Sequence, residues 1–248
     1  MMKNMKYWMI VAALMGSMTS VKAQSSPSSE EASGSANKIE IGLGADVVSQ
    51  YIWRGMELAH PSLQPQISAA WKGLSLSAWG NIGLANSDDP RELDLTLSYS
   101  IGGLSVGVND YWADGFDTRY FYYKHPDTGH SFEGFVAYDF DILNVSWQTF
   151  FAGYDHMLES DRRAYSSYFE VGAPFRLATC EWRAAAGFVP WKSDYYSTTG
   201  FAVTNLSLRA MKEVKITDSF SLPLFGELIA NPCHQNMYLV FGFTVKAL

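Results

Sequence analysis

The sequence is poor in charge, cysteine and long apolar runs. Charged residues make up 17% of its 248 residues and aromatic residues 15%, and there are only two cysteines. Past the N-terminus, no apolar run approaches the roughly 18–20 residues that a membrane helix needs. The mean hydropathy is nevertheless close to zero. This average fits strands that alternate apolar and polar residues, in a membrane barrel or in a soluble β-sandwich.

Basic residues are scarce as well. The chain has 18 Lys and Arg against 25 Asp and Glu, a formal charge of −7. Nucleic-acid binding depends on a cationic surface. We therefore expect no nucleic-acid partner.

The motifs of several kinds of site are missing. The sequence contains no G-x-S-x-G, phosphate loop, dinucleotide fingerprint or EF-hand loop. The spacings of its five histidines match no zinc motif, and we expect all of them in polar outer loops. An enzyme needs a nucleophile, a base and an orienting group that converge. We therefore expect neither enzymatic activity nor a cofactor nor a metal.

The N-terminus reads as an export signal. Lys3 and Lys6 form a basic start, residues 8–15 form a short apolar stretch, and small residues end at Ala23. We expect a cleaved signal peptide over residues 1–23. Residues 24–37 lack large apolar side chains and cannot bury a core, which predicts a disordered leader.

From Ile39 onward the dominant period is two. Alternate side chains of a strand point to opposite faces, so the segment from Ile39 to Val47 has one apolar face and one small or polar face. We expect this strand to continue through Tyr51 and Trp53 on the apolar face, with Arg54 opposite. That length suits the ~9–11 residues that cross a bilayer at a tilt.

The same alternation recurs along the chain and gives about twelve strands. It is seen at 66–71, 74–82, 92–99, 105–109, 132–140, 143–151, 169–173, 182–188, 205–209, 222–228 and 239–246.

Connections between these segments alternate between short and long, as they do in transmembrane barrels. We therefore expect an all-β fold over residues 38–248: a transmembrane antiparallel up-and-down β-barrel with both termini on the short-turn, periplasmic side. The short turns are 72–73, 102–103, 141, 175–178 and 212–218, and the long loops are 56–61, 85–91, 113–130, 153–163, 190–200 and 231–235.

Aromatic residues cluster toward the two expected membrane interfaces, although aromatics are also simply good strand formers. Trp71, Tyr99, Tyr138 and Phe175 lie near short turns, and Tyr51, Trp53, Trp112, Phe151 and Phe188 lie near long loops.

Several short motifs support this fold by resemblance. The segments Ser49–Gly55, Pro61–Pro65 and Ala78–Gly80 resemble the first hairpins of the TorF-type porin family, in its Bacteroidetes branch. The later segments Phe201–Asn205 and Ala230–Pro232 are similar to that branch too. The resemblance spans most of the chain after residue 37. It implies an outer-membrane barrel with a channel role.

Charged residues on the polar strand faces are the candidate site residues. They either line a water-filled path and select solutes, or pair across a narrow interior and plug it; we favour the path. They are Glu40, Asp46, Arg54, Asp94, Glu133, Glu170, Glu181, Arg183, Arg209 and Glu227.

Arg54 has two interpretations. It is a rim charge that steers solutes, or it pairs with a lumen carboxylate and fixes the first hairpin. We favour the second, because Arg forms bidentate carboxylate pairs. Cys180 and Cys233 are expected at opposite ends of the barrel, too far apart for a disulfide.

The sequence thus predicts an outer-membrane channel for passive diffusion of small hydrophilic solutes. Its expected partners are outer-membrane lipid, lipopolysaccharide and the barrel assembly machinery, and the oligomeric state stays open. Two alternatives remain. One is a barrel without transport that acts in adhesion or as a scaffold through its aromatic third loop, and the other is a lipid-modifying enzyme.

Overall fold

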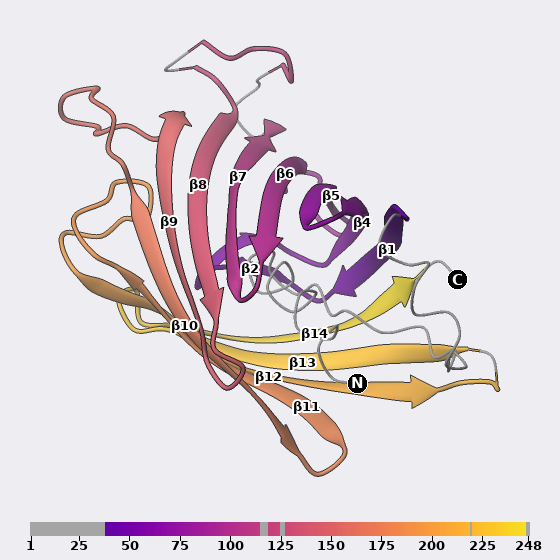
Figure 1. The fold of residues 1–248 in the computed structure, drawn as a ribbon. Coiled ribbons are helices and arrows are strands. Elements are labelled where there is room, and N and C mark those ends of the chain that lie inside the picture. The colour runs from indigo at the N-terminus through magenta and orange to yellow at the C-terminus, as the bar shows by residue number, and fades with distance from the viewer. Residues whose placement is uncertain (1–37, 115–118, 125–126, 219, 247–248) are drawn as a thin grey trace.

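Twelve antiparallel strands close into a single barrel (Figure 1). The computed structural model describes residues 38–114, 119–124, 127–218 and 220–246. Each strand pairs with its neighbours along the chain, and β1 closes the ring by pairing with both β4 and β14. The predicted barrel is confirmed. The predicted signal peptide and leader lie outside the described residues.

The barrel strands are 9 to 14 residues long, enough to cross a bilayer at a tilt. In the described part of the chain, no helix is long and apolar enough to cross a membrane. The strands are β1 (Glu40–Val48), β4 (Ser62–Trp71), β5 (Leu74–Gly83), β6 (Glu92–Ile101), β7 (Leu104–Ala113), β8 (His130–Asp139), β9 (Asn144–Gly153), β10 (Ser167–Leu177), β11 (Cys180–Val189), β12 (Ala202–Lys215), β13 (Ser221–Asn231) and β14 (Asn236–Lys246).

The two faces of the wall differ as the alternation predicts. On β6, Leu97 is 53% exposed, whereas its neighbours Thr96 and Ser98 are buried on the inner face. On β14, Leu239 and Phe241 are exposed in the same way. Such a continuous apolar exterior would be unfavourable in water and is suited to lipid. The polar side chains therefore face the lumen.

Tight turns gather at one end of the barrel and long connections at the other (Figure 1). Lys72 and Gly73 both have positive φ, as a two-residue hairpin turn requires. Two turns are shorter than the sequence predicts. β10 and β12 continue their ladders to Leu177 and Lys215, because backbone pairing carries strands into segments that look like turns by composition.

Exposed aromatic rings surround the turn end of the barrel. Trp71, Tyr99, Tyr138 and Phe175 are all exposed there, as an interface girdle requires. At the other end only part of the predicted set faces outward: Phe151 is exposed, whereas Tyr51 is buried inside the barrel.

The predicted course of the first strand is wrong beyond Val48. β1 ends at Val48, and the chain then forms a separate hairpin of β2 (Tyr51–Trp53) and β3 (Met56–Ala59). The alternation predicts wall for the first of these strands and an outer loop for the second. The rings of Tyr51 and Trp53 pack inside the barrel rather than against lipid, which explains apolar side chains outside the wall.

Candidate functional site

The β2–β3 hairpin turns at Arg54 and Gly55. Their φ values of 51° and 82° are both positive, the pattern of a two-residue hairpin turn of type I′. The hairpin leaves the wall where Val48 of β1 faces Ser62 of β4. In Figure 1, β2 lies between the walls of the barrel. The first long connection is therefore an inward element.

Contacts fix this hairpin to opposite sides of the lumen. The Tyr51 ring lies 5.3 Å from that of Trp79 on β5. On the far side, Asn231 Nδ2 of β13 donates a 3.0 Å hydrogen bond to the Gly55 carbonyl. Between them, the Trp53 ring meets Tyr111 of β7 at 5.8 Å. The hairpin thus reaches across the barrel and narrows its interior.

Gly55 is needed for the closest of these approaches. A Cβ at this position would lie 1.8 Å from the backbone carbonyl oxygen of Thr204 on β12. Thr204 lies beside an irregularity in the β11–β12 pairing, where the register shifts between Gly187 and Phe188. Such a bulge redirects the backbone locally, here next to the hairpin turn.

We expect Gly55→Ala to lower the free energy of unfolding by more than about 1 kcal/mol, because it combines a positive φ with a backbone clash. The matched control is Gly102→Ala, which has a positive φ of 61° but no heavy atom within 4 Å of the added Cβ. Urea unfolding in detergent micelles compares the two. Equal effects would show that the hairpin turn does not press against β12.

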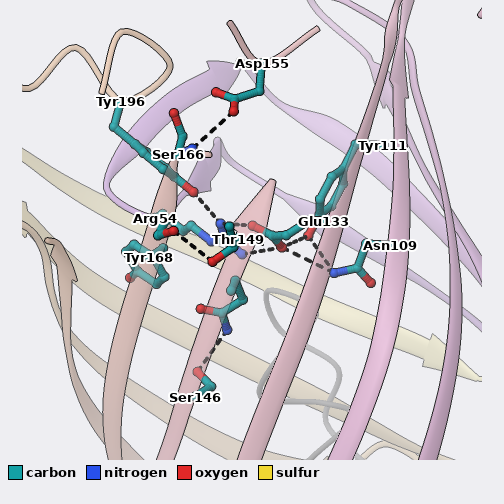
Figure 2. Close-up of polar contacts among 12 residues, drawn as sticks. Arg54, Asn109, Tyr111, Glu133, Ser146, Thr149, Asp155, Ser166, Tyr168 and Tyr196 are labelled. Atoms are coloured by element: carbon teal, nitrogen blue, oxygen red, sulfur yellow. Dashed lines mark hydrogen bonds and ion pairs between the residues drawn. The ribbon is translucent and has the colours of Figure 1, made fainter. Parts of the chain in front are cut away.

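Arg54 extends from this turn to a carboxylate on the wall. Its Nη1 and Nη2 donate to the two oxygens of Glu133 on β8 at 2.6 and 2.8 Å. Glu133 is fully buried, and it also accepts hydrogen bonds from Tyr111 Oη at 2.8 Å and Asn109 Nδ2 at 3.3 Å (Figure 2). A bidentate, charge-assisted pair with further donors is among the stronger polar contacts in proteins.

Aromatic rings enclose the same guanidinium. Its Cζ lies 4.3 Å from the Trp53 ring centroid and 4.6 Å from that of Tyr168 on β10, both within cation–π range. Nη1 also donates to the hydroxyl of Tyr196, which comes from the β11–β12 loop. Burial raises the pKa of Tyr196 above its usual value, so the hydroxyl stays neutral. Arg54 is therefore a fixed centre where wall, hairpin and loop meet.

Of the other predicted lumen charges, four form cross-strand ion pairs, two are aspartates on the inner face, and two are glutamates exposed at the turn end. Glu170 pairs with Arg183 at 2.6 Å and Arg209 with Glu227 at 3.1 Å, each between strands of the wall. The remaining predicted residues have no common site. Asp46 is buried, Asp94 is partly buried on the lumen face of β6, and Glu40 and Glu181 are exposed at the turn end, where Glu181 pairs with Arg176.

Sequence reasoning missed the uncharged partners of the ion pair. Tyr111 and Tyr168 lie on the lumen face by the same alternation that places Trp112 and Phe169 outside, so strand parity could have found them. Tyr196 lies in the β11–β12 loop, which also turns inward. No periodicity places a loop residue.

The third long connection, between β7 and β8, contacts the outer side of the wall, whereas the first enters the lumen. In its described part, the Tyr120 carbonyl lies 2.5 Å from His130 Nε2, and the Tyr123 ring stacks on His130 at 4.3 Å. His130 and Trp112, which Tyr120 also contacts, belong to the outward face of β7 and β8. Tyr120 and Tyr123 therefore pack against the outward face of the wall at its loop-end rim.

The prediction that all five histidines lie in outer loops is wrong. His130 is the first residue of β8 and is buried. His60 lies in the rim with its Nδ1 2.8 Å from Asp89, and this hydrogen bond raises the pKa of His60. His156 and His234 are in loops, whereas His125 lies outside the described residues. Within the described ranges, no group of three His, Cys, Asp or Glu is placed to hold a metal.

The two cysteines are both free. Cys180 begins β11 at the turn end, and Cys233 lies in the β13–β14 connection at the loop end. Their placement follows the predicted topology.

Comparison with known proteins gives structural likenesses only. No family model matches the chain, and no significant relative was found among curated proteins. The NanC porin structure is 9% identical, with a TM-score of 0.45 over 84% of this chain and 100% of that one. An outer-membrane channel from Pseudomonas putida F1 is 10% identical, with a TM-score of 0.40 over 86% and 98%. OmpF of Salmonella typhi is 10% identical, with a TM-score of 0.32 over 86% and 98%.

Proposed function

We propose that the protein is an outer-membrane channel for passive diffusion of small hydrophilic solutes, narrowed at its loop end by the inward β2–β3 hairpin. The observation that carries this proposal is the polar, charged inner face of a closed barrel whose outer face is apolar. A sheet can place such a face at membrane depth only when it closes into a barrel, since every backbone group of the wall is then paired.

The inner face supports passage of hydrophilic rather than apolar solutes. Its polar side chains bond to one another across neighbouring strands, as Gln64 does with Asn81 at 3.1 Å and Thr96 with Asn109 at 2.8 Å. Side chains already held by the wall offer hydrogen bonds to a passing solute without collapsing into the lumen. The resemblance to TorF-type porins fits this role. We propose lipopolysaccharide, outer-membrane lipid and the assembly machinery as the partners of such a barrel.

A plugged barrel and a channel differ in their ionic conductance, which can be measured. Purified protein in a planar bilayer should give discrete but small conductance steps, because the hairpin occupies part of the cross-section. Liposome swelling with sugars of increasing size should give a low size limit. The control is the same preparation after heat denaturation. A silent bilayer from protein that still shows heat-modifiable gel mobility would overturn the channel.

A further inference from the structure

An aromatic surface continues from the outer wall into the connection between β7 and β8. On the wall, the rings of Phe151 and Phe132 lie 6.4 Å apart, and Phe132 stacks on His130 at 5.9 Å. Tyr123 of the connection stacks on the same imidazole at 4.3 Å. Both Phe151 and Tyr123 are exposed. Rings from β9, β8 and the connection therefore form one outward surface at the loop end of the barrel.

The connection carries a cation at each end of a short aromatic run. Residues 119–124 read Arg-Tyr-Phe-Tyr-Tyr-Lys, and both charged side chains are exposed. Phe121, inside the run, is 85% exposed. Among the ion pairs of the described residues, none includes Arg119 or Lys124, although acids outnumber bases in the chain. Two positive charges thus flank a strip of exposed rings.

Hydrogen bonds hold this run against the rim. The Tyr120 carbonyl lies 2.5 Å from His130 Nε2. Thr128 Oγ1 donates to the Tyr122 carbonyl at 2.8 Å, and the Tyr122 N–H donates to the Arg119 carbonyl at 3.0 Å. A surface that is already ordered loses little conformational entropy when it binds a ligand.

The position of the run suits lipid head groups rather than acyl chains. Its residues lie at the loop end, beyond the outward rings of Phe132 and Phe151, where the apolar wall ends (Figure 1). Tyrosine is common at this level of a membrane, because its ring is apolar and its hydroxyl is polar. Exposed rings that met only water would be unfavourable. Their cationic flanks indicate an anionic ligand that also offers apolar surface.

We infer that residues 119–124, together with Phe132 and Phe151, form a docking surface for the phosphorylated head group of lipopolysaccharide. This inference rests on the outer-membrane placement of the proposed channel. Arg119 offers a planar fork of N–H donors to a phosphate, and Lys124 offers a compact charge. The rings between them pack against the apolar faces of the sugars and the first carbons of the acyl chains.

The closing experiment measures binding of lipid A, the phosphorylated and acylated disaccharide of lipopolysaccharide, to the full-length protein in detergent micelles by native mass spectrometry. The double variant Arg119→Gln, Lys124→Gln should weaken binding at least about tenfold, because both contacts to phosphate lose their charge. Phe121→Ser removes one ring and no charge, so it should weaken binding less. The control is Lys192→Gln, which removes an exposed cation that pairs with Glu159 in another loop and should leave binding unchanged.

Three further probes test which part of the lipid is recognised. Dephosphorylated lipid A should bind the parent protein as weakly as lipid A binds the double variant. Phosphatidylglycerol, which has a phosphate but no sugar, should bind less tightly than lipid A, and excess inorganic phosphate should not displace lipid A. The surface is overturned if the double variant binds lipid A like the parent, if either other lipid binds as tightly as lipid A, or if inorganic phosphate displaces it.

Conductance separates this surface from the channel. The double variant should keep the conductance of the parent, because the run contacts the outer side of the wall. If the bilayer is silent but the double variant loses lipid A, the surface stands and the channel fails. If currents are seen and the double variant binds lipid A like the parent, the channel stands and the surface fails. Heat-modifiable gel mobility checks that each variant is folded.

Discussion

Arg54→Ala is expected to lower the free energy of unfolding by about 3–5 kcal/mol, the cost of leaving a buried charge without its partner. Glu133 is fully buried and receives both guanidinium donors of Arg54. In the variant, Tyr111 and Asn109 would remain as donors, but no positive charge would face the carboxylate. Urea unfolding in detergent micelles, followed by tryptophan fluorescence, measures the loss.

A matched surface pair provides the control. Arg176 and Glu181 form an ion pair of 2.7 Å, but their side chains are 76% and 54% exposed. Exposed pairs contribute about 0–1 kcal/mol, so Arg176→Ala should have a small effect.

The double variant Arg54→Met, Glu133→Gln distinguishes lost charge balance from lost packing. It removes both charges and keeps an acceptor for Tyr111 and Asn109, so it should recover much of the stability lost in Arg54→Ala. If Arg54→Ala costs no more than Arg176→Ala, or if the double variant is less stable than Arg54→Ala, the buried pair does not anchor the hairpin.

The wall of the barrel could be predicted from the sequence, because strand parity links every side chain to one of two faces. Once Leu97 and Phe241 are assigned to lipid, the same rule places Thr96 and Gly242 inside. The alternating lengths of the connections then fix which end carries the turns. Errors at the strand ends, as at Leu177, arise where backbone pairing overrides composition.

The constriction could not be predicted in the same way. Tyr51 and Trp53 continue the period of β1. The alternation of a strand does not distinguish an apolar side chain that contacts lipid from one that packs against aromatic rings in the lumen. The Arg54–Gly55 turn left a local signal, since a glycine between two short alternating segments indicates a hairpin. The position of this turn inside the barrel depends on the ion pair of Arg54 with Glu133. Glu133 is 79 residues away in the chain, and no local pattern connects it to Arg54.

Replacing residues 49–61 with a two-residue Asn-Gly turn is expected to increase the single-channel conductance several-fold. Val48 and Ser62 are register partners, so a tight hairpin can join β1 directly to β4 without moving either strand. The change removes the element that spans from Trp79 on β5 to Asn231 on β13, and with it an obstruction of the lumen.

Single-residue variants grade this effect. Trp53→Ala keeps the hairpin but removes a ring that contacts Tyr111 and Tyr196, so its conductance should fall between those of the parent and the hairpin replacement. Tyr123→Ala changes a ring of similar size on the outer wall and should leave the conductance unaltered. Heat-modifiable gel mobility confirms that each barrel is closed.

The conductances of these variants show which part of the barrel limits the passage of solutes. A graded rise would locate the resistance at the loop end, where Arg54 is held between wall and hairpin, and would make this hairpin the determinant of solute size. Unchanged conductance in the hairpin replacement would place the limiting cross-section elsewhere along the strands. The hairpin would then be an internal brace, with its aromatic and ionic contacts serving to stiffen a twelve-stranded wall.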